Sequence, residues 1–169
     1  MRKDEFLRLP KEELVDLIDA YAKLYTALDG LWFVSVEKQY GNQVAARLDT
    51  VVWDSLLPRE AKRITEARKL GEGGLETVIE AFKLRPNFLT KEYDIVRGKN
   101  KVIVRVTACR SLHAMERDGR AVSSCKRMLE EVYPKFVENI DNRLKFRVLK
   151  APPRASENDT CCEWQVEIP

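Results

Sequence analysis

The stretch that decides the fold covers residues 101–126 and reads KVIVRVTACRSLHAMERDGRAVSSCK. Its first part places valines at every second position, a period that predicts a strand with one buried face: Val102, Val104 and Val106. The strand ends near Cys109, and a short helical segment then leads to Cys125 at the start of a longer helix. This stretch therefore links a β-sheet to helices and places two cysteines at the junction.

Three further strands are expected around it. Residues 93–95 alternate in the same way and precede the turn residues 97–100, so they predict a β-hairpin with the central strand. Near the C-terminus, two more alternating segments surround Pro152-Pro153: Leu144, Phe146 and Val148, then Cys162, Trp164 and Val166. We expect a four-stranded, mostly antiparallel sheet with helices between the strands.

The first 86 residues are helical in pattern. Apolar residues at helical spacing predict helices over 11–28, 31–40, 42–56, 59–70 and 75–82. Asp29-Gly30 is interpreted as a break, and Pro58 as the start of a new helix, although one continuous kinked helix is the alternative. In residues 123–140, Pro134 should kink or divide a helix. The predicted fold is α+β, one domain over 1–169 with a helical half (1–86) and an α/β half (87–169).

Composition limits the classes of function. The chain has 169 residues, and its 30 basic and 27 acidic side chains are mixed along the sequence, which disfavours a nucleic-acid partner. No apolar run is long enough for a membrane span, and the N-terminus has no signal-peptide pattern, so we expect a cytoplasmic protein. In a reducing compartment its four cysteines are expected to be buried, metal-binding or reactive rather than disulfide-bonded.

The cysteines outline a candidate site. Cys125 falls in the first turn of a predicted helix beside Lys126, where a thiolate is stabilised, so it is the candidate nucleophile, with His113 as its base. A Cys3His zinc site is the metal alternative, with ligands Cys109, His113, Cys125 and Cys162. Buried inert thiols are the structural alternative. Strand alternation places Cys162 inward and Cys161 on the polar face.

Four aromatic residues are candidates for the lining of an apolar ligand pocket: Trp32, Phe33, Trp53 and Trp164. Core packing is the alternative for each of them.

Several motifs together resemble an uncharacterised family of prokaryotic cytosolic proteins. They include DGLWF at 29–33, VRVT-x-C ending at Cys109, the APP of 151–153 and CEW at 162–164. Family members usually place proline directly after the first cysteine, where this chain has Arg110, and many have another cysteine within 147–150. The resemblance therefore carries over only Cys109, Cys125 and Cys162.

The C-terminal half is also similar, more distantly, to the L-2-amino-thiazoline-4-carboxylic acid hydrolase-like family, and its last strand to vinyl-4-reductase-type sensor domains. These likenesses imply a cavity between helices and sheet. Three hypotheses follow: a small-molecule-binding protein with the cysteines at the pocket wall, a thiol- or zinc-dependent hydrolase acting on a C–N bond of a small heterocycle or amidine, and a structural or partner-binding protein. Pairing into a homodimer is left open.

Overall fold

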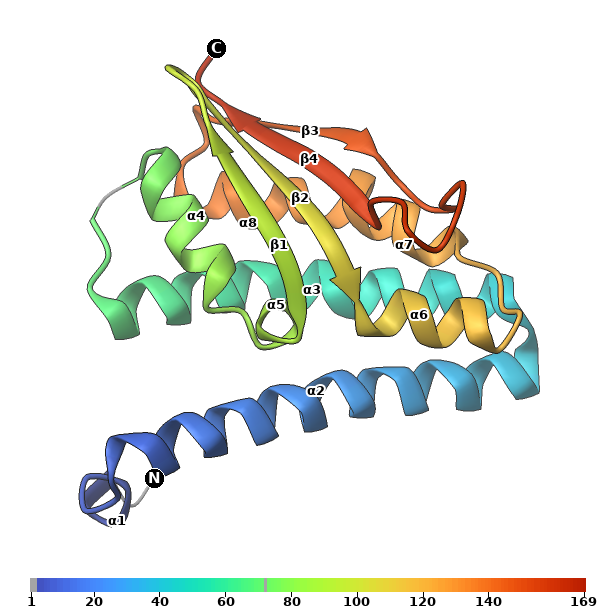
Figure 1. The fold of residues 1–169 in the computed structure, drawn as a ribbon, viewed down its shortest axis with the longest axis horizontal. Coiled ribbons are helices and arrows are strands. Elements are labelled where there is room, and N and C mark those ends of the chain that lie inside the picture. The colour runs from blue at the N-terminus through green and yellow to red at the C-terminus, as the bar shows by residue number, and fades with distance from the viewer. Residues whose placement is uncertain (1–2, 72) are drawn as a thin grey trace.

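The computed structural model describes residues 3–71 and 73–169 (Figure 1). The N-terminal part holds helices only, and the strands follow after residue 90. The elements in chain order are α1 (Lys3–Phe6), α2 (Lys11–Tyr40), α3 (Asn42–Arg68), α4 (Leu75–Lys83), α5 (Pro86–Leu89), β1 (Lys91–Arg97), β2 (Lys101–Cys109), α6 (Arg110–Arg117), α7 (Ser123–Arg127), the π-helical turn η1 (Met128–Val132), α8 (Tyr133–Ile140), β3 (Lys145–Lys150) and β4 (Cys162–Glu167).

The sheet confirms the predicted α+β class. Its four strands are all antiparallel, in the order β1-β2-β4-β3. Val104 of β2 lies opposite Trp164 of β4, and Trp164 lies opposite Val148 of β3. Because side chains alternate along each strand, one face carries the buried Val102, Val104, Val106, Trp164 and Val166. This face is the sheet's contribution to the core.

Helix α2 is continuous, so the predicted interruption at Asp29-Gly30 is wrong. A glycine inside a helix costs only about 1 kcal/mol relative to alanine. Ala22 before it and Phe33 after it are both buried against the rest of the fold, and this packing outweighs the local cost. The predicted helix end at Gly41 is confirmed, with a positive φ of 84°.

Helix α3 also continues through its proline. Pro58 lies inside α3, so the separate helix expected from residue 59 does not form, and the continuous helix that was the alternative does. A proline inside a helix costs roughly 3 kcal/mol. Trp53, Leu57 and Ala61 are buried on both sides of Pro58 and hold the helix together across it. Pro134, in contrast, lies at the start of α8 directly after the π-helical turn, so the predicted division at this proline is confirmed.

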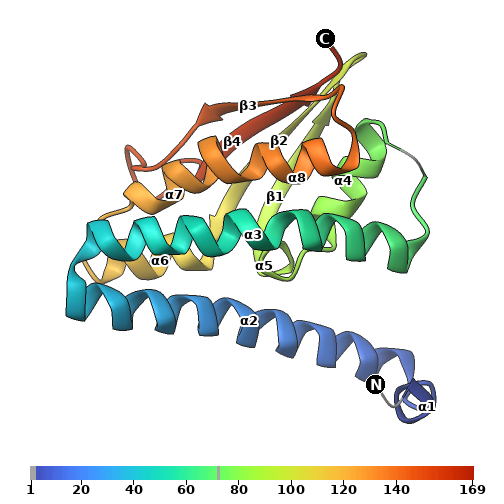
Figure 2. The ribbon, with the colours of Figure 1, turned by 180° about the vertical axis from the view of Figure 1, so that it is seen from behind.

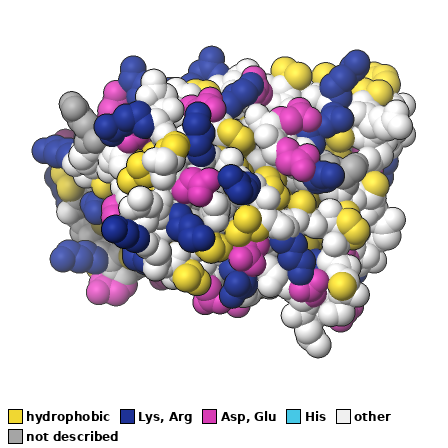
Figure 3. Space-filling model, turned by 90° about the horizontal axis from the view of Figure 1, so that it is seen from above, with side chains coloured by type: hydrophobic (Ala, Val, Ile, Leu, Met, Phe, Trp, Pro, Cys, Tyr) yellow, Lys and Arg dark blue, Asp and Glu magenta, His cyan; other side chains and the backbone are white. Residues whose placement is uncertain are grey.

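The elements form layers. Seen from behind, α8 lies in front of the strands, α3 lies beside it, and α2 forms the outermost layer (Figure 2). The core between α3, α8 and the sheet includes Leu57, Phe82, Phe136 and Trp164, each almost fully buried. The face seen from above mixes basic and acidic side chains without a region of one sign (Figure 3). Within residues 3–71 and 73–169, no helix has the length and apolar character of a membrane span.

Candidate functional site

A cavity of about 110 Å³ lies where α2 and α3 approach α6, α7 and the ends of β2 and β4. Part of its lining is apolar, including Trp53, Leu112 and Leu129. Its remaining lining residues are Asp29, Asp49, Asn87, Lys91, Cys109, Ser111, Met115, Ser124, Cys125, Met128, Tyr133, Pro152, Cys161 and Cys162. All four cysteines of the chain therefore meet at one cavity, and all four are free thiols.

Two carboxyl groups lie at the side of the cavity formed by the long helices. Asp29 of α2 accepts a hydrogen bond from Trp53 Nε1 of α3 at 3.0 Å. Burial raises the pKa of the Asp49 carboxyl to about 7, and the nearby charge of Asp29 adds to this rise. Burial likewise raises the pKa of Asp29, while the hydrogen bond from Trp53 works against that rise. Burial thus favours the protonated form of both carboxyl groups.

Three buried polar atoms at the cavity lack a hydrogen-bond partner among the described residues. They are Asp49 Oδ1, Asn87 Oδ1 and Ser124 Oγ, which come from three different elements of the fold. Buried polar groups in native proteins are almost always paired. Two acceptor oxygens and one hydroxyl group therefore belong to residues that line the same cavity and have no partner among the described residues.

Lysine 91 also lines the cavity, and its ammonium group makes one hydrogen bond and one ring contact. Lys91 Nζ donates to the backbone oxygen of Asn87 at 2.8 Å and lies 5.7 Å from the centre of the Phe88 ring. Asp49 Oδ1 has no hydrogen-bond partner among the described residues.

The sequence-based expectation of a stabilised thiolate at Cys125 is wrong. Burial raises the pKa of the Cys125 thiol to about 12, and the neighbouring Cys109 adds to the effect more than Lys91 offsets it. The thiol donates to Met115 Sδ at 3.9 Å, a weak contact. Cys125 does lie in the first turn of a helical run, as predicted, because α7 continues directly into η1 and α8. Burial outweighs the stabilisation that this helix start offers to a thiolate. Burial also raises the pKa of the Cys162 thiol to about 12.

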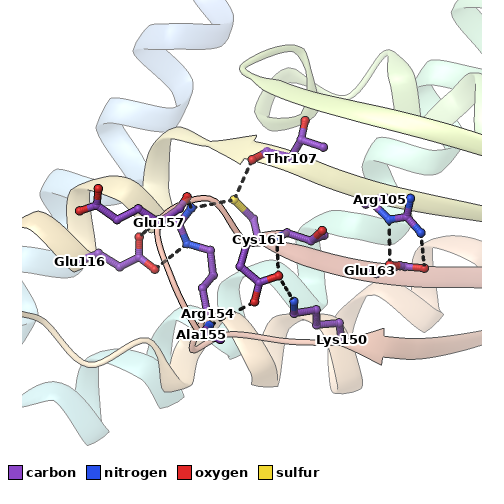
Figure 4. Close-up of polar contacts among 11 residues, drawn as sticks. Arg105, Thr107, Glu116, Lys150, Arg154, Ala155, Glu157, Cys161 and Glu163 are labelled. Atoms are coloured by element: carbon purple, nitrogen blue, oxygen red, sulfur yellow. Dashed lines mark hydrogen bonds and ion pairs between the residues drawn. The ribbon is translucent and has the colours of Figure 1, made fainter.

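Cysteine 161 is buried rather than exposed on the polar face, which corrects the expectation from strand alternation. It precedes β4, and its thiol donates to the backbone oxygen of Thr107 at 3.4 Å (Figure 4). Arg154 covers it from the loop between β3 and β4, with Nη1 4.0 Å from the sulfur. Arg154 is itself held by Glu116 of α6, with Nε to Oε1 at 2.9 Å. The thiol of Cys161 thus lies between strand β2 and the loop residue Arg154, as Figure 4 shows.

An outer groove adjoins the cavity between α2 and α6. The groove and the cavity share four lining residues: Asp29, Asp49, Ser111 and Met115. Basic side chains of the α6 region line the groove, among them Arg110, His113 and Arg120. The shared residues place the outer groove directly beside the cavity.

The structure separates the predicted base from the thiols. His113 is exposed and lines the outer groove, whereas Cys109, Cys125 and Cys162 line the inner cavity. Across residues 3–71 and 73–169, no group of three or more His, Cys, Asp or Glu side chains is arranged to hold a metal ion. The four residues proposed as zinc ligands are thus not assembled as a metal site here, and zinc binding stays a prediction.

The four candidate aromatic residues do not share one pocket. Trp53 lines the cavity, and Phe33 is buried beside Ala45 and Ala46 and lines the outer groove. Trp164 is fully buried, with its ring 4.6 Å from that of Phe82. Trp32 is 37% exposed on α2 and lines neither space. Only Trp53 therefore belongs to the cavity.

Several cavity residues were not among the sequence-based candidates: Asp29, Asp49, Asn87, Lys91, Met115, Ser124 and Met128. Two of them carry a signal that helical spacing reveals. Asp49 lies four residues before Trp53 and four after Ala45, on the buried face of α3. Asp29 lies four residues before Phe33, on the buried face of α2. A carboxyl group on an otherwise apolar helix face is a sign of function.

Comparison with known proteins gives one match. The model of a family described only as a family of unknown function (DUF6125) matches residues 7–168. No curated protein matches, and no solved structure matches. The resemblance to an uncharacterised family is thereby supported, while the likenesses to the hydrolase-like and vinyl-4-reductase-type families receive no support.

Proposed function

The chain belongs to this family of unknown function, and from its own geometry we propose that it binds a small organic molecule carrying an amine or amidine group in the cysteine-lined cavity. The observation that carries the proposal is the set of three oxygen atoms without a partner among the described residues, each able to accept a hydrogen bond: Asp49 Oδ1, Asn87 Oδ1 and Ser124 Oγ. Leaving a buried acceptor unpaired costs about 1–3 kcal/mol. A ligand that supplies N–H donors removes this cost.

The charge of the site favours a cationic donor. An ionised Asp49 pairs well with an ammonium or amidinium group in a site that is partly shielded from water. Because the pKa of Asp49 is about 7, a bound cation also favours the ionised form of this carboxyl at neutral pH. The Trp53 ring, which lines the same cavity, offers a face for a cation.

Size and apolar lining restrict the rest of the ligand. An apolar cavity of roughly 150 Å³ holds one benzene molecule, so a cavity of about 110 Å³ fits a molecule smaller than benzene. Leu112, Leu129 and Met128 line the same cavity and would contact the ligand's carbon skeleton. The ligand class is therefore a small amine or amidine with a short apolar part.

The binding proposal is stronger than the hydrolase alternative. A thiol hydrolase needs a thiolate and a base within hydrogen-bond reach, but the raised pKa of Cys125 keeps its thiol protonated at neutral pH. The only histidine, His113, lines the outer groove instead. Thiols that stay protonated act in the cavity as soft apolar wall groups.

The test compares ligands of one shape and opposite charge. Acetamidinium and acetate are nearly isosteric, and propionamidinium and propionate form a slightly larger pair. We expect the amidinium ions to raise the Tm and to bind measurably by calorimetry, while the carboxylates do neither. Asp49→Asn should weaken amidinium binding at least about 10-fold, whereas Asp19→Asn, an exposed carboxyl of α2 paired with Lys23, should leave it unchanged.

Equal binding of both members of each pair, or full binding by Asp49→Asn, would refute the proposal. Mass spectrometry of the recovered ligand separates binding from catalysis. An intact amidine after prolonged incubation supports the binding protein, whereas conversion to the amide and ammonia would establish the hydrolase instead.

A further inference from the structure

Helix α2 leaves an apolar face uncovered on the outside of the molecule. Tyr21, Leu24, Leu28 and Leu31 are all strongly exposed, and the exposed fraction reaches 69% for Leu28 and Leu31. Figures 1 and 2 both show α2 as the outermost layer, with its inner side toward α3 and α6. Contiguous exposed apolar surface of this kind marks an interaction site.

The spacing of this face is that of a coiled coil. Apolar residues alternate in steps of three and four along the helix, which is the heptad pattern of positions a and d. We call this set the outer seam: Leu14, Leu17, Tyr21, Leu24, Leu28, Leu31 and Ser35. Ser35 fits the seam because its hydroxyl is satisfied within the helix, donating to the backbone oxygen of Leu31 at 2.7 Å. A repeat of 3.5 residues indicates that another helix packs along the seam.

Small residues border the seam. Ala20 and Ala27 lie beside it, seven residues apart and exposed. The strip of helix surface from these alanines, across the outer seam, to Leu14, Tyr21 and Leu28 carries no charged residue within positions 14–35. Small side chains next to a leucine seam allow two helices to approach closely. The partner is therefore a helix with a matching apolar seam.

Two copies of the outer seam are complementary when their helices run in opposite directions. If Leu24 of one copy faces Leu28 of another, then Tyr21 faces Leu31, and Leu17 faces Ser35. This correspondence holds in both directions, as a twofold interface requires.

Charges at the two ends support the same arrangement. The first turn of α2 carries Glu12 and Glu13, and its last turn carries Lys38. In the antiparallel register, Leu14 of one copy lies level with Lys38 of the other, so Glu13 lies next to that lysine. Each end of the interface then joins an acidic and a basic residue, and the two opposed helix dipoles are favourably aligned. A parallel pair would instead place like charges together.

We propose that two copies of this chain form an antiparallel homodimer through the outer seam of α2. The contact lies on the side of α2 away from α3, so it requires no rearrangement of the fold. Ala27 and Leu31 also line the outer groove, so the second copy lies beside the entrance to the cavity.

The first test is the mass in solution. The chain has a mass of 19.6 kDa, and sedimentation equilibrium between roughly 1 and 100 μM should give twice this value. The double variant Leu24→Glu/Leu28→Glu should raise the dissociation constant at least about 100-fold. Its control, Leu149→Glu on exposed β3, should leave the mass unchanged. A monomeric wild type, or an unaffected double variant, would overturn the proposal.

A charge exchange tests the antiparallel register without touching the apolar seam. Glu13→Lys alone and Lys38→Glu alone should each weaken self-association about 10-fold, because each creates two like-charge contacts per dimer. A mixture of the two variants should associate as strongly as the wild type, since both ends of the mixed dimer then pair opposite charges. A mixture no stronger than its components would overturn the register. If the wild type is monomeric but binds anionic phospholipid vesicles through the outer seam, the dimer proposal is wrong, and the seam binds a membrane surface instead.

Discussion

The guanidinium of Arg85, which has no exposed surface, donates through Nε to Oε2 of Glu60 at 2.8 Å. Tyr25 of α2 donates its hydroxyl to the other carboxylate oxygen, Oε1, also at 2.8 Å. The guanidinium carbon lies about 5 Å from the centre of the Tyr133 ring (4.9 Å) and of the Phe136 ring (5.0 Å). One carboxylate thus connects α2, α3 and the segment before α5, and balances a cation inside the core.

Replacing Glu60 should therefore destabilise the fold strongly. Glu60→Ala leaves the Arg85 charge buried without a carboxylate, and breaking a buried pair from one side costs about 3–5 kcal/mol. Urea unfolding followed by tryptophan fluorescence measures this loss. Glu76→Ala is the matched control, since it removes the exposed ion pair with Arg97 and should cost less than about 1 kcal/mol. Similar losses in the two variants would contradict a structural role for the buried pair.

The carboxyl of Asp49 should make stability decrease as the pH rises from about 4 to 7. Its pKa is about 7 in the folded protein because of burial and Asp29, against 3.8 ordinarily. Between these values the folded state binds more protons than the unfolded state, so each pH unit in that window removes up to roughly 1.4 kcal/mol. Asp49→Asn should flatten this dependence, and urea unfolding at pH 5 and pH 8 measures the difference.

The exposed Asp19 provides the comparison for Asp49. Asp19→Asn removes a carboxyl that is paired only with Lys23 on the surface of α2, so the pH dependence of stability should stay as in the wild type. If Asp49→Asn keeps the wild-type decrease between pH 5 and pH 8, the shifted carboxyl is not responsible for it.

The cavity thiols should react slowly in the native protein. A pKa of about 12 for Cys125 and Cys162 leaves about a thousandfold less thiolate at pH 7.5 than an ordinary cysteine has. We expect a disulfide reagent to modify these residues at a correspondingly low rate, and all four cysteines rapidly in urea. Peptide mapping by mass spectrometry assigns the rates. Rapid native modification of Cys125 would restore it as a candidate nucleophile.

Arg154 controls the access to Cys161. Removing its side chain in Arg154→Ala should speed the modification of Cys161, because the guanidinium covers the sulfur and holds the loop to Glu116. Arg117→Ala serves as the control, since Arg117 is exposed and pairs only with the neighbouring Asp118. Equal modification rates for Cys161 in both variants would show that the strand alone, and not the loop, protects the thiol.

Local pattern predicted most of the secondary structure and failed where packing over a longer distance decided the outcome. The alternation of Val102, Val104 and Val106 predicted a central strand because one face of the sheet is buried along its whole length. Asp29-Gly30 and Pro58 are local breaks in sequence, but the buried residues on both sides of each keep α2 and α3 continuous. The free-energy cost of a glycine or proline inside a helix can be estimated from the sequence. The tertiary packing that outweighs this cost depends on residues far apart in the chain.

The site was predicted in part. The meeting of Cys109, Cys125 and Cys162 at one cavity agrees with the proposed cysteine cluster, because the residues lie at the ends of β2, β4 and the adjoining helix. The thiolate at Cys125 was not correctly predicted, because the direction of its pKa shift depends on burial by elements distant in sequence. Asp29 and Asp49 lie 20 residues apart and meet only because α2 and α3 fold back on each other.

Gly73 should resist substitution because of its contact with Asp141. It has a φ of +71°, and a Cβ atom there would lie 2.6 Å from Asp141 Oδ2. That same oxygen accepts from the backbone N–H of Gly74 at 2.8 Å and from Arg143 Nη2 at 2.8 Å, so it has no room to move. Gly73→Ala should lower the free energy of unfolding by about 1–3 kcal/mol, while Gly71→Ala, with open space around it, should not.

Asp141 should make the stability of the fold decrease as the pH falls, whereas Asp49 makes it decrease as the pH rises. Hydrogen bonds from the Arg143 side chain, together with the backbone N–H of Gly74, hold the pKa of Asp141 well below its usual value. The stabilisation is therefore present above the ordinary carboxyl pKa and is lost as the pH falls toward the lower, folded-state value. Asp141→Asn should lower the Tm at pH 7 but have progressively less effect as the pH decreases below 4. A Tm difference that stays constant with pH would mean that Asp141 contributes through shape rather than charge.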